Sequence, residues 1–284
     1  KNYRILSHNK IPIVNKILSF VAIISFFKKT INLKPKLILI VRCGKLSLLG
    51  LFVSKLRNIP IAIDYPSSSF FENPILLQFS KSVYYRKTWI KSSYPINMHW
   101  MFNNFIDKKI IKNSKWIISP SERFSQYLLE ERGADKQTIL LLPNSVDANR
   151  FYPQKKNSKL RKKLGISRSS FIVVFSCSPT WSMNIVALES FLEEAVSFFS
   201  KETQISFLII GPESEKYEKY TDKFIFTGLI PFKDMVRYIN LADVCISPYP
   251  DGHESPNHLK NAEYMACGKP IIGTKNGLVG YENT

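Results

Sequence analysis

The chain of 284 residues has little cysteine, and what it has is dispersed. Its four cysteines form none of the close pairs that zinc and redox motifs use; they are Cys43, Cys177, Cys245 and Cys267. Isolated cysteine packs as a small hydrophobic residue, so we expect reduced, buried thiols and a cytosolic compartment. No other cluster of metal-ligating side chains is present in the sequence, which predicts no metal site and no resident cofactor.

Glycine and long apolar runs are also scarce. With 11 glycines and no internal repeat, the sequence excludes low-complexity and solenoid architectures. The most apolar stretch, Ile11–Phe27, has 17 residues and is interrupted by Asn15 and Lys16, whereas a spanning helix needs about 20 apolar residues. It also lacks the small-residue cleavage site of a signal peptide. We therefore expect this stretch neither to span a membrane nor to act as a leader.

Acidic residues are rare in the first half only. Residues 1–160 contain 27 Lys and Arg against 8 Asp and Glu, whereas residues 161–284 contain 13 against 14. A genome-wide preference for lysine would raise both halves alike, so the asymmetry favours an anionic partner for the first half. Residues 81–115 interleave aromatic with basic side chains, as membrane-interface segments and single-stranded nucleic acid sites do. No compact nucleic-acid motif is present, so we favour an anionic membrane surface over nucleic acid.

Short β-branched runs alternate with longer amphipathic stretches along the whole chain. Strands are expected at residues 37–41, 59–63, 115–119, 138–142, 171–176, 206–210, 224–226, 244–247 and 270–273, with helices such as 186–200 and 233–241 between them. This alternation predicts parallel sheets covered by helices. The polar segment 153–168 is expected to open a second domain with a short surface helix. The predicted fold class is α/β, with two doubly wound, Rossmann-like domains facing a cleft, residues 1–153 and 154–284.

The segment 244–273 predicts a strand, a loop, a helix, a tight turn and a strand. Ser255 followed by Pro256 favours a helix start, and Gly268 favours its end. A helix N-terminus at the carboxyl end of a parallel strand is where doubly wound sheets bind phosphates, so we expect a diphosphate there. Glu263 follows two turns later in an apolar stretch. Its carboxylate needs hydroxyl or amide partners, which a ligand or local groups could supply.

The same segment resembles a known family. Residues 263–272, Glu-Tyr-Met-Ala-Cys-Gly-Lys-Pro-Ile-Ile, resemble the E-A-M-A-x-G-x-P-V-V signature of family-4-type GT-B glycosyltransferases. Other motifs follow in the family's order: residues 116–121 (end of the first sheet), 142–153 (P-N-G-V-D…F-x-P), 226–228 (F-x-G), 242–244 (A-D-V) and 247–248 (P-S). The resemblance covers roughly residues 35–284. It implies a GT-B fold in which the second domain holds a nucleotide-sugar and the first takes the acceptor.

The resemblance also implies roles for residues of the donor site. Glu263 is expected to bind the ribose hydroxyls, and the loop 252–258 to hold the sugar and phosphates. The donor-contacting residues that we infer are Glu263, Ser255, Asn257, His258, Lys260, Ser178, Thr180 and Asn144.

The sequence departs from the family in two places. An acid usually lies eight positions before the ribose-binding Glu, but here that position is Ser255 and Glu254 precedes it. An Arg and a Lys usually neutralise the diphosphate in the first turn of the second domain, where residues 177–184 read Cys-Ser-Pro-Thr-Trp-Ser-Met-Asn. Such a turn can bind phosphate through hydroxyls and N–H groups, yet it lacks two charge-assisted bonds, for which Lys260 or His258 could compensate. The alternative is an ordinary helix start.

Two acids are candidates for the chemistry. Asp64 ends the strand 59–63 and is one of three acids among residues 1–119; a strand end at the cleft is a useful place for a base. A turn-stabilising role for Asp64 is the alternative. Glu254 is the second candidate, from the resemblance.

The function expected is glycosyl transfer from a nucleotide-sugar to a glycan or lipid-linked acceptor. Retention of configuration, and envelope polysaccharide or glycoconjugate synthesis, are what the resemblance implies. A helix dipole and basic groups would stabilise the leaving diphosphate without a metal. An epimerase-like sugar-nucleotide enzyme and a degenerate, non-catalytic scaffold are the alternatives. The chain begins with Lys1 and stops after a strand-to-helix connection, so we expect a fragment of a cytoplasmic protein, peripheral at the inner face of the cytoplasmic membrane.

Overall fold

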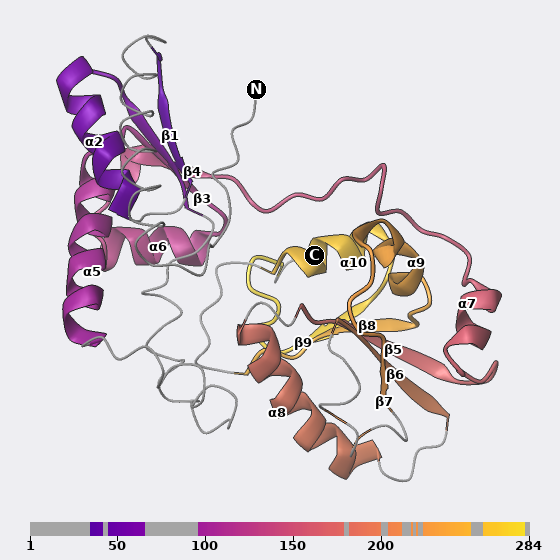
Figure 1. Ribbon diagram of the computed structural model, residues 1–284. Helices are drawn as coiled ribbons and strands as arrows, with labels where there is room; N and C mark the ends of the chain where they lie inside the picture. The colour runs from indigo at the N-terminus through magenta and orange to yellow at the C-terminus, as the bar shows by residue number, and fades with distance from the viewer. Residues whose placement is uncertain are drawn as a thin grey trace, which may run out of the picture. The chain divides into compact units, whose positions relative to one another are not determined.

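The chain folds into two compact units, each with its own parallel sheet (Figure 1). The computed structural model describes residues 35–41, 45–65, 96–178, 182–199, 204–211, 217, 220, 224–250 and 258–281. The first unit contains the described residues up to 65, 96–119 and 124–141, and the second contains 120–123 and the rest from Leu142 onward. The predicted α/β class with two parallel sheets is confirmed.

The first unit has a four-stranded sheet in the order β1-β2-β3-β4, with every neighbouring pair parallel. Its strands are β1 (Ile38–Val41), β2 (Ile61–Asp64), β3 (Trp116–Ser119) and β4 (Ile139–Leu141), and its helices are α2 (Lys45–Arg57), α5 (Ile96–Lys112), α6 (Glu122–Glu130) and the 3-10 helix η1 (Lys136–Thr138). Central β2 is buried on both faces at Ile61, Ala62 and Ile63, as parallel strands are. The helices α2 and α5 lie side by side (Figure 1).

These strands lie within two residues of their predicted positions. The largest shift is at β2, which begins at Ile61 and not at Ile59. Asn58 adopts a φ of 52°, and the Ile59 N–H donates to the Ser54 carbonyl at 3.0 Å. Because this turn closes the end of α2, Ile59 contributes its buried side chain to the core without joining the sheet.

A buried ion pair ties α5 to the chain that follows α6. Asp107, 1% exposed, accepts a hydrogen bond from the Tyr65 hydroxyl, and its other oxygen lies 3.7 Å from Arg132 Nε. Arg132 also donates to the Tyr127 hydroxyl at 2.6 Å and to the Asn104 amide oxygen. The acid therefore faces the core, and the guanidinium is held by two further groups of the same unit.

Replacing Asp107 by alanine is expected to lower the free energy of unfolding by about 3–5 kcal/mol, because the buried Arg132 charge loses its counter-ion. Urea denaturation measures the change. Glu131→Ala, an exposed acid near the same arginine, is the control and should cost less than about 0.5 kcal/mol. Equal losses for the two variants would show that the ion pair does not stabilise this unit.

The second unit has a five-stranded parallel sheet in the order β7-β6-β5-β8-β9. Its strands are β5 (Phe171–Ser176), β6 (Ile205–Ile210), β7 (Phe224–Phe226), β8 (Val244–Ser247) and β9 (Ile271–Gly273). The chain builds outward from β5 in one direction and then returns to add β8 and β9 on the other side. The sheet therefore has a topological switch point between β5 and β8, where doubly wound sheets bind ligands at the carboxyl ends of the strands.

Helices cover both faces of this sheet (Figure 1). They are α7 (Ser158–Lys163), α8 (Ser182–Phe199), the 3-10 helix η3 (Phe232–Asp234), α9 (Met235–Ile239) and α10 (Leu259–Ala266). One hydrophobic cluster joins α8 to the sheet, and a second joins α9 and α10 to the opposite face. The three described cysteines, Cys177, Cys245 and Cys267, are buried in these clusters, as expected; Cys43 lies outside the described residues.

The segment that leads into β5 packs with the second unit. Phe151 is 2% exposed within the cluster under α9 and α10, and Asn240 binds the backbone on both sides of Pro153, at Tyr152 O (3.1 Å) and Gln154 N (2.8 Å). The sequence-based boundary placed residues up to 153 in the first domain, whereas the contacts group residues from Leu142 with the second. The buried Phe151 ring explains the difference, because the cluster in which it packs belongs to the second unit.

The aspartate of the A-D-V motif has a structural role in the second sheet. Asp243 Oδ2 accepts the Ile172 N–H at 2.9 Å, and Oδ1 accepts from Lys156 Nζ. Burial raises the pKa of Asp243, but the bonds from Lys156 and Ile172 outweigh it and hold the pKa below its usual value. The carboxylate thus joins the start of β5 to the start of β8.

No helix among the described residues combines the length and apolar character needed to cross a membrane. The stretch Ile11–Phe27 lies outside them, as do residues 81–95 of the aromatic-basic segment.

Candidate functional site

Polar side chains gather at the switch point between β5 and β8. Ser176 ends β5 and Cys177 follows it, Tyr249 follows β8, and α10 and the first turn of α8 lie beside them. Tyr264 fixes α10 in this place, because its buried hydroxyl accepts the Ser176 N–H at 2.7 Å and lies 2.8 Å from the Ser176 hydroxyl. The residues of α10 adjacent to Tyr264 are therefore presented at the carboxyl end of the central strand.

The helix α10 begins later than the sequence predicted. Its first residue is Leu259, and its N-cap is His258 in an extended conformation, so the expected start at Ser255 and Pro256 is wrong. The His258 ring stacks on Tyr249, with 3.6 Å between the ring centroids, and is 2% exposed. This tertiary stack keeps His258 outside the helix. Burial and the Lys260 charge lower the pKa of His258 well below its usual value, so the ring is neutral.

The end of α10 follows the prediction. Gly268 has a φ of +65°, its N–H donates to Met265 O at 2.8 Å, and the Lys269 N–H donates to Tyr264 O at 3.0 Å. These two bonds form a Schellman motif, which needs a left-handed residue that glycine adopts without steric cost.

Lys260 extends from α10 to the start of α8. Its Nζ donates to Asn184 Oδ1 at 2.8 Å and to the Tyr249 hydroxyl, and it lies 4.6 Å from the centroid of the Phe175 ring. Asn184 in turn accepts from the Tyr249 hydroxyl and donates to Ser178 O at 2.9 Å. An ammonium group has three N–H donors, and among the described residues Lys260 Nζ has two hydrogen-bond acceptors, Asn184 Oδ1 and the Tyr249 hydroxyl.

Burial gives Lys260 and Glu263 unusual ionisation. Burial lowers the pKa of Lys260 to about 8, against the opposing effects of Cys177 and Glu263. Burial raises the pKa of Glu263 to about 7, against the opposing Lys260 charge. Glu263 is half-buried, and within the described part of the chain its carboxylate accepts no hydrogen bond. Both groups therefore titrate close to neutral pH and have capacity to bind a ligand.

The segment after β9 passes directly over the end of β8. Ser247 Oγ donates to Gly277 O at 2.8 Å, and Asn261 Nδ2 donates to the same carbonyl at 2.7 Å. A Cβ at Gly277 would lie 1.8 Å from Ser247 O, so only glycine fits there. The fully buried Asn261 keeps an Oδ1 with no hydrogen-bond donor among the described residues. This crossing fixes the position of α10 from its other side.

The sequence-predicted site residues fall into three groups. Lys260 and Glu263 lie on α10, and His258 is its N-cap. Ser178 is linked to Lys260 through Asn184, which donates to the Ser178 carbonyl. Asn144 lies in the segment of the second unit that leads to β5, and Asp64 ends β2 in the first unit. Glu254, Ser255, Asn257 and Thr180 lie outside the described residues.

Sequence reasoning missed Asn184 and Tyr249 as members of the site. Tyr249 follows the Ser247-Pro248 motif, and Asn184 lies in the first turn of α8. Nothing in the local sequence distinguished Asn184 from the other polar residues of that helix. Among the described residues, no group of three or more His, Cys, Asp or Glu side chains could hold a metal ion.

The lysine and the half-buried carboxylate lie at the switch point of the parallel sheet, which is where doubly wound α/β domains bind ligands. Residues 170–282 match the family model of Glycosyl transferases group 1, and this span contains all of the α10 site. Over residues 170–282 the match confirms the resemblance that the motifs indicated. No curated protein sequence matches the chain.

Solved structures of GT-B glycosyltransferases share the fold. Sucrose-phosphate synthase from Thermosynechococcus elongatus aligns with a TM-score of 0.64 and 18% identity over 90% of this chain and 60% of its own. A glycosyltransferase from Rickettsia africae aligns at 0.63 and 16%, over 98% and 67%. Anabaena HepE in complex with UDP-glucose aligns at 0.56 and 16%, over 84% and 60%. The chain thus spans 60% to 67% of the length of these three structures.

Proposed function

We propose that this protein is a glycosyltransferase that moves a sugar from a nucleotide-sugar donor to an acceptor. The observation that carries the proposal is that Lys260 and Glu263 lie on the same helix, α10, at the switch point of the second sheet. The family match of residues 170–282 and the UDP-glucose bound by the structurally similar HepE support the same donor class.

Each group of the site has a distinct role in this proposal. The Glu263 carboxylate accepts hydrogen bonds from the two ribose hydroxyls, which supply the partners that the described residues do not. Lys260 directs its remaining N–H bond at the diphosphate and offsets the charge that develops as the sugar leaves. The N-terminal N–H groups of α10 act in the same direction. These groups make a metal ion unnecessary for the step.

The acceptor side of the proposal rests on the first unit. We place the acceptor there and propose Asp64, at the end of β2, as the group that contacts its reacting hydroxyl. Glu254 is proposed to contact the donor sugar. A lipid-linked or envelope glycan suits the basic first half of the chain, and retention of configuration follows the family resemblance. This assignment places the enzyme in the cytoplasm at the inner membrane face.

A transfer assay tests the proposal. The full chain is incubated with nucleotide-sugars radiolabelled in the sugar, with and without glycan and lipid-linked acceptors. Appearance of label in the acceptor together with free nucleotide supports transfer. Interconversion of the sugar nucleotide without an acceptor would identify an epimerase instead, and binding without turnover would identify a scaffold.

The affinity for a nucleoside diphosphate is expected to be greatest between about pH 7 and pH 8. Hydroxyl donors prefer an ionised Glu263, so affinity rises as pH passes its pKa of about 7. The diphosphate prefers a charged Lys260, so affinity falls as pH passes about 8. Calorimetric titrations across this range measure both the rise of the affinity near pH 7 and its fall near pH 8. Glu263→Gln should remove the contribution of Glu263 to the rise, and any rise that remains reports the ionisation of the ligand's own phosphates.

A further inference from the structure

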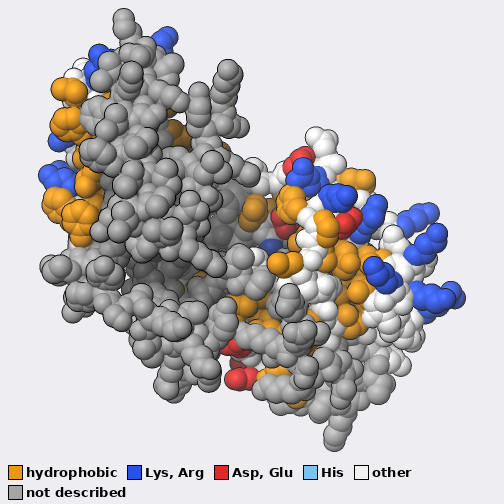
Figure 2. All heavy atoms as spheres, in the orientation of Figure 1, with side chains coloured by type: hydrophobic (Ala, Val, Ile, Leu, Met, Phe, Trp, Pro, Cys, Tyr) orange, Lys and Arg blue, Asp and Glu red, His pale blue; other side chains and the backbone are white. Residues whose placement is uncertain are grey.

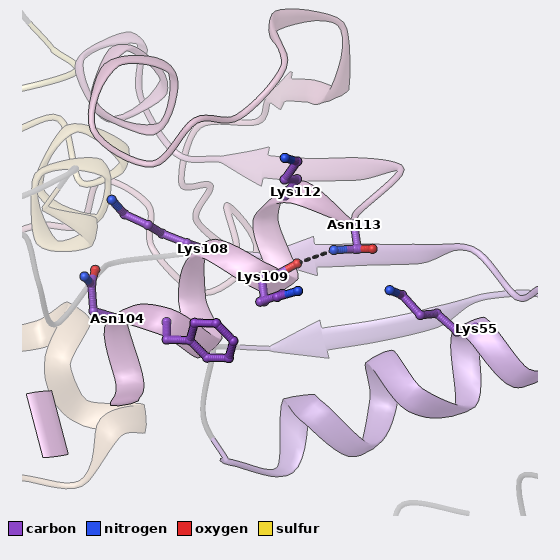
Figure 3. A pocket seen from close by; sticks show the side chains of 7 residues that line it. Lys55, Asn104, Lys108, Lys109, Lys112 and Asn113 are labelled. Atoms are coloured by element: carbon purple, nitrogen blue, oxygen red, sulfur yellow. Dashed lines mark hydrogen bonds between the residues drawn. The ribbon is translucent and has the colours of Figure 1, made fainter. Parts of the chain in front are cut away.

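The first unit carries a basic groove between α2 and α5 (Figure 3). The groove has a volume of about 640 Å³ and is lined by Lys55 of α2 and by Asn104, Phe105, Lys108, Lys109, Lys112 and Asn113 of α5 and its end. Four lysines and no acid line it. The charge of the groove is therefore wholly positive.

Neither of the two helices carries an exposed acid that would neutralise this charge. Helix α2 contains no acid, and the one acid of α5, Asp107, is 1% exposed and bound to Tyr65 and Arg132 in the core. The lysines of α5 therefore have no acidic neighbour on their own helix at the surface. In Figure 3 the Lys55 and Lys109 side chains extend from α2 and α5 into the space between the helices.

Large apolar side chains on the same two helices are also exposed to solvent. Phe52 and Leu56 on α2 are 56% and 63% exposed, and Phe102 and Phe105 on α5 are 45% and 55% exposed. Phe52, Lys55 and Leu56 follow the i, i+3, i+4 spacing of one helix face. Figure 2 shows such hydrophobic and basic side chains next to one another on the edge that carries α2 and α5.

Apolar and basic residues also share one face of α5. Phe102, Phe105, Lys109 and Lys112 recur at intervals of three and four residues, so they form one stripe along the helix. Lys109 Nζ lies 5.7 Å from the centroid of the Phe105 ring. Apolar bodies and ammonium heads are thus interleaved on a single surface, which is the pattern of helices that lie in a membrane interface.

We propose that the α2–α5 face docks on an anionic bilayer, with lipid headgroup phosphates in the lysine groove and the four apolar side chains at the headgroup–acyl boundary. Phosphate complements the four lysines, and the aliphatic Leu56 favours lipid over nucleic acid, because bases stack on rings and gain nothing from an aliphatic chain. The inference deepens the proposed function, on which it rests for a membrane-borne acceptor. It assigns the membrane contact to a surface other than the donor site.

Vesicle sedimentation at low salt tests the docking. The full chain should sediment with phosphatidylcholine vesicles that contain phosphatidylglycerol and remain in solution with phosphatidylcholine alone. Replacing Lys109 and Lys112 together by glutamate should weaken the binding by about twentyfold or more, since each lysine near an anionic surface contributes about fivefold. The matched control makes the same change at Lys159 and Lys162, two exposed lysines of α7 in the second unit, and should have a small effect.

A second pair of variants tests the apolar part. Leu56→Ser and Phe105→Ser should each weaken vesicle binding while leaving the circular dichroism spectrum unchanged, because both side chains are exposed. Equal losses for the α5 and α7 charge reversals would overturn the assignment of the surface, and so would tighter binding to single-stranded oligonucleotides than to the vesicles. Nucleotide affinity, measured on the same variants, separates the two proposals. Intact nucleotide binding with no vesicle binding contradicts the docking surface alone.

Discussion

Replacing Lys260 by methionine is expected to lower kcat/KM for the nucleotide-sugar by about a hundredfold to a thousandfold, the range found when one preorganised electrostatic group is removed. Methionine fills a similar volume, and the Tyr249 hydroxyl still donates to Asn184 Oδ1, so neither polar group is left without a partner. The variant should therefore fold normally. Affinity for the nucleoside diphosphate should fall by about tenfold to a hundredfold, because a charge-assisted bond is lost.

Lys269→Met is the matched control for this change. Lys269 follows α10 by a short turn, and its Nζ donates to the Asn240 and Ala242 carbonyls at 3.1 and 3.0 Å, away from the Lys260 cluster. Its replacement should lower stability without changing nucleotide affinity. Equal kinetic losses for the two lysine variants would show that Lys260 acts only through the fold.

Replacing Glu263 by alanine is expected to weaken nucleoside diphosphate binding by about a hundredfold, because two hydrogen bonds to a charged acceptor are lost. Stability should rise slightly or stay unchanged at pH 8, since burial makes the ionised carboxylate unfavourable in the absence of ligand. A loss of affinity with no loss of stability is what distinguishes a ligand-binding carboxylate from a structural one. Thermal unfolding and calorimetry on the same sample measure both.

Local sequence patterns predicted the second sheet closely. The runs Phe171–Ser176, Phe224–Phe226 and Val244–Ser247 match the observed strands residue for residue. Each is a short apolar run bounded by polar residues, so its length is fixed by the chain itself. The left-handed turn at Gly268 was predictable for the same reason, since only glycine adopts that conformation without strain.

Features that depend on distant contacts were not predictable. The local sequence at Ser255 and Pro256 predicts a helix start. However, α10 begins at Leu259, because His258 is stacked on Tyr249. The grouping of Phe151 with the second unit depends on a core that lies far along the chain. In both cases tertiary packing outweighs local preference.

The site also contains residues that local sequence could indicate and contacts that it could not. Lys260 and Glu263 could be selected because charged residues on an apolar helix stand out in sequence. The contacts of Lys260 with Asn184 and Tyr249 could not be predicted, because 76 residues separate Asn184 from Lys260 and only the fold brings them together. The departure from the family at residues 177–184 has a structural counterpart, since a lysine from α10 reaches the start of α8. We propose that this lysine takes the place of the family's basic pair.

The most direct measurement of the central claim is a calorimetric comparison of a nucleoside diphosphate with its 2′,3′-dideoxy analogue, on the wild-type chain and on Glu263→Ala. If Glu263 binds the ribose hydroxyls, the wild type should prefer the ribose form by about tenfold or more, and the variant should bind both forms equally. A preference that persists unchanged in Glu263→Ala would contradict the assignment of the nucleotide site to α10.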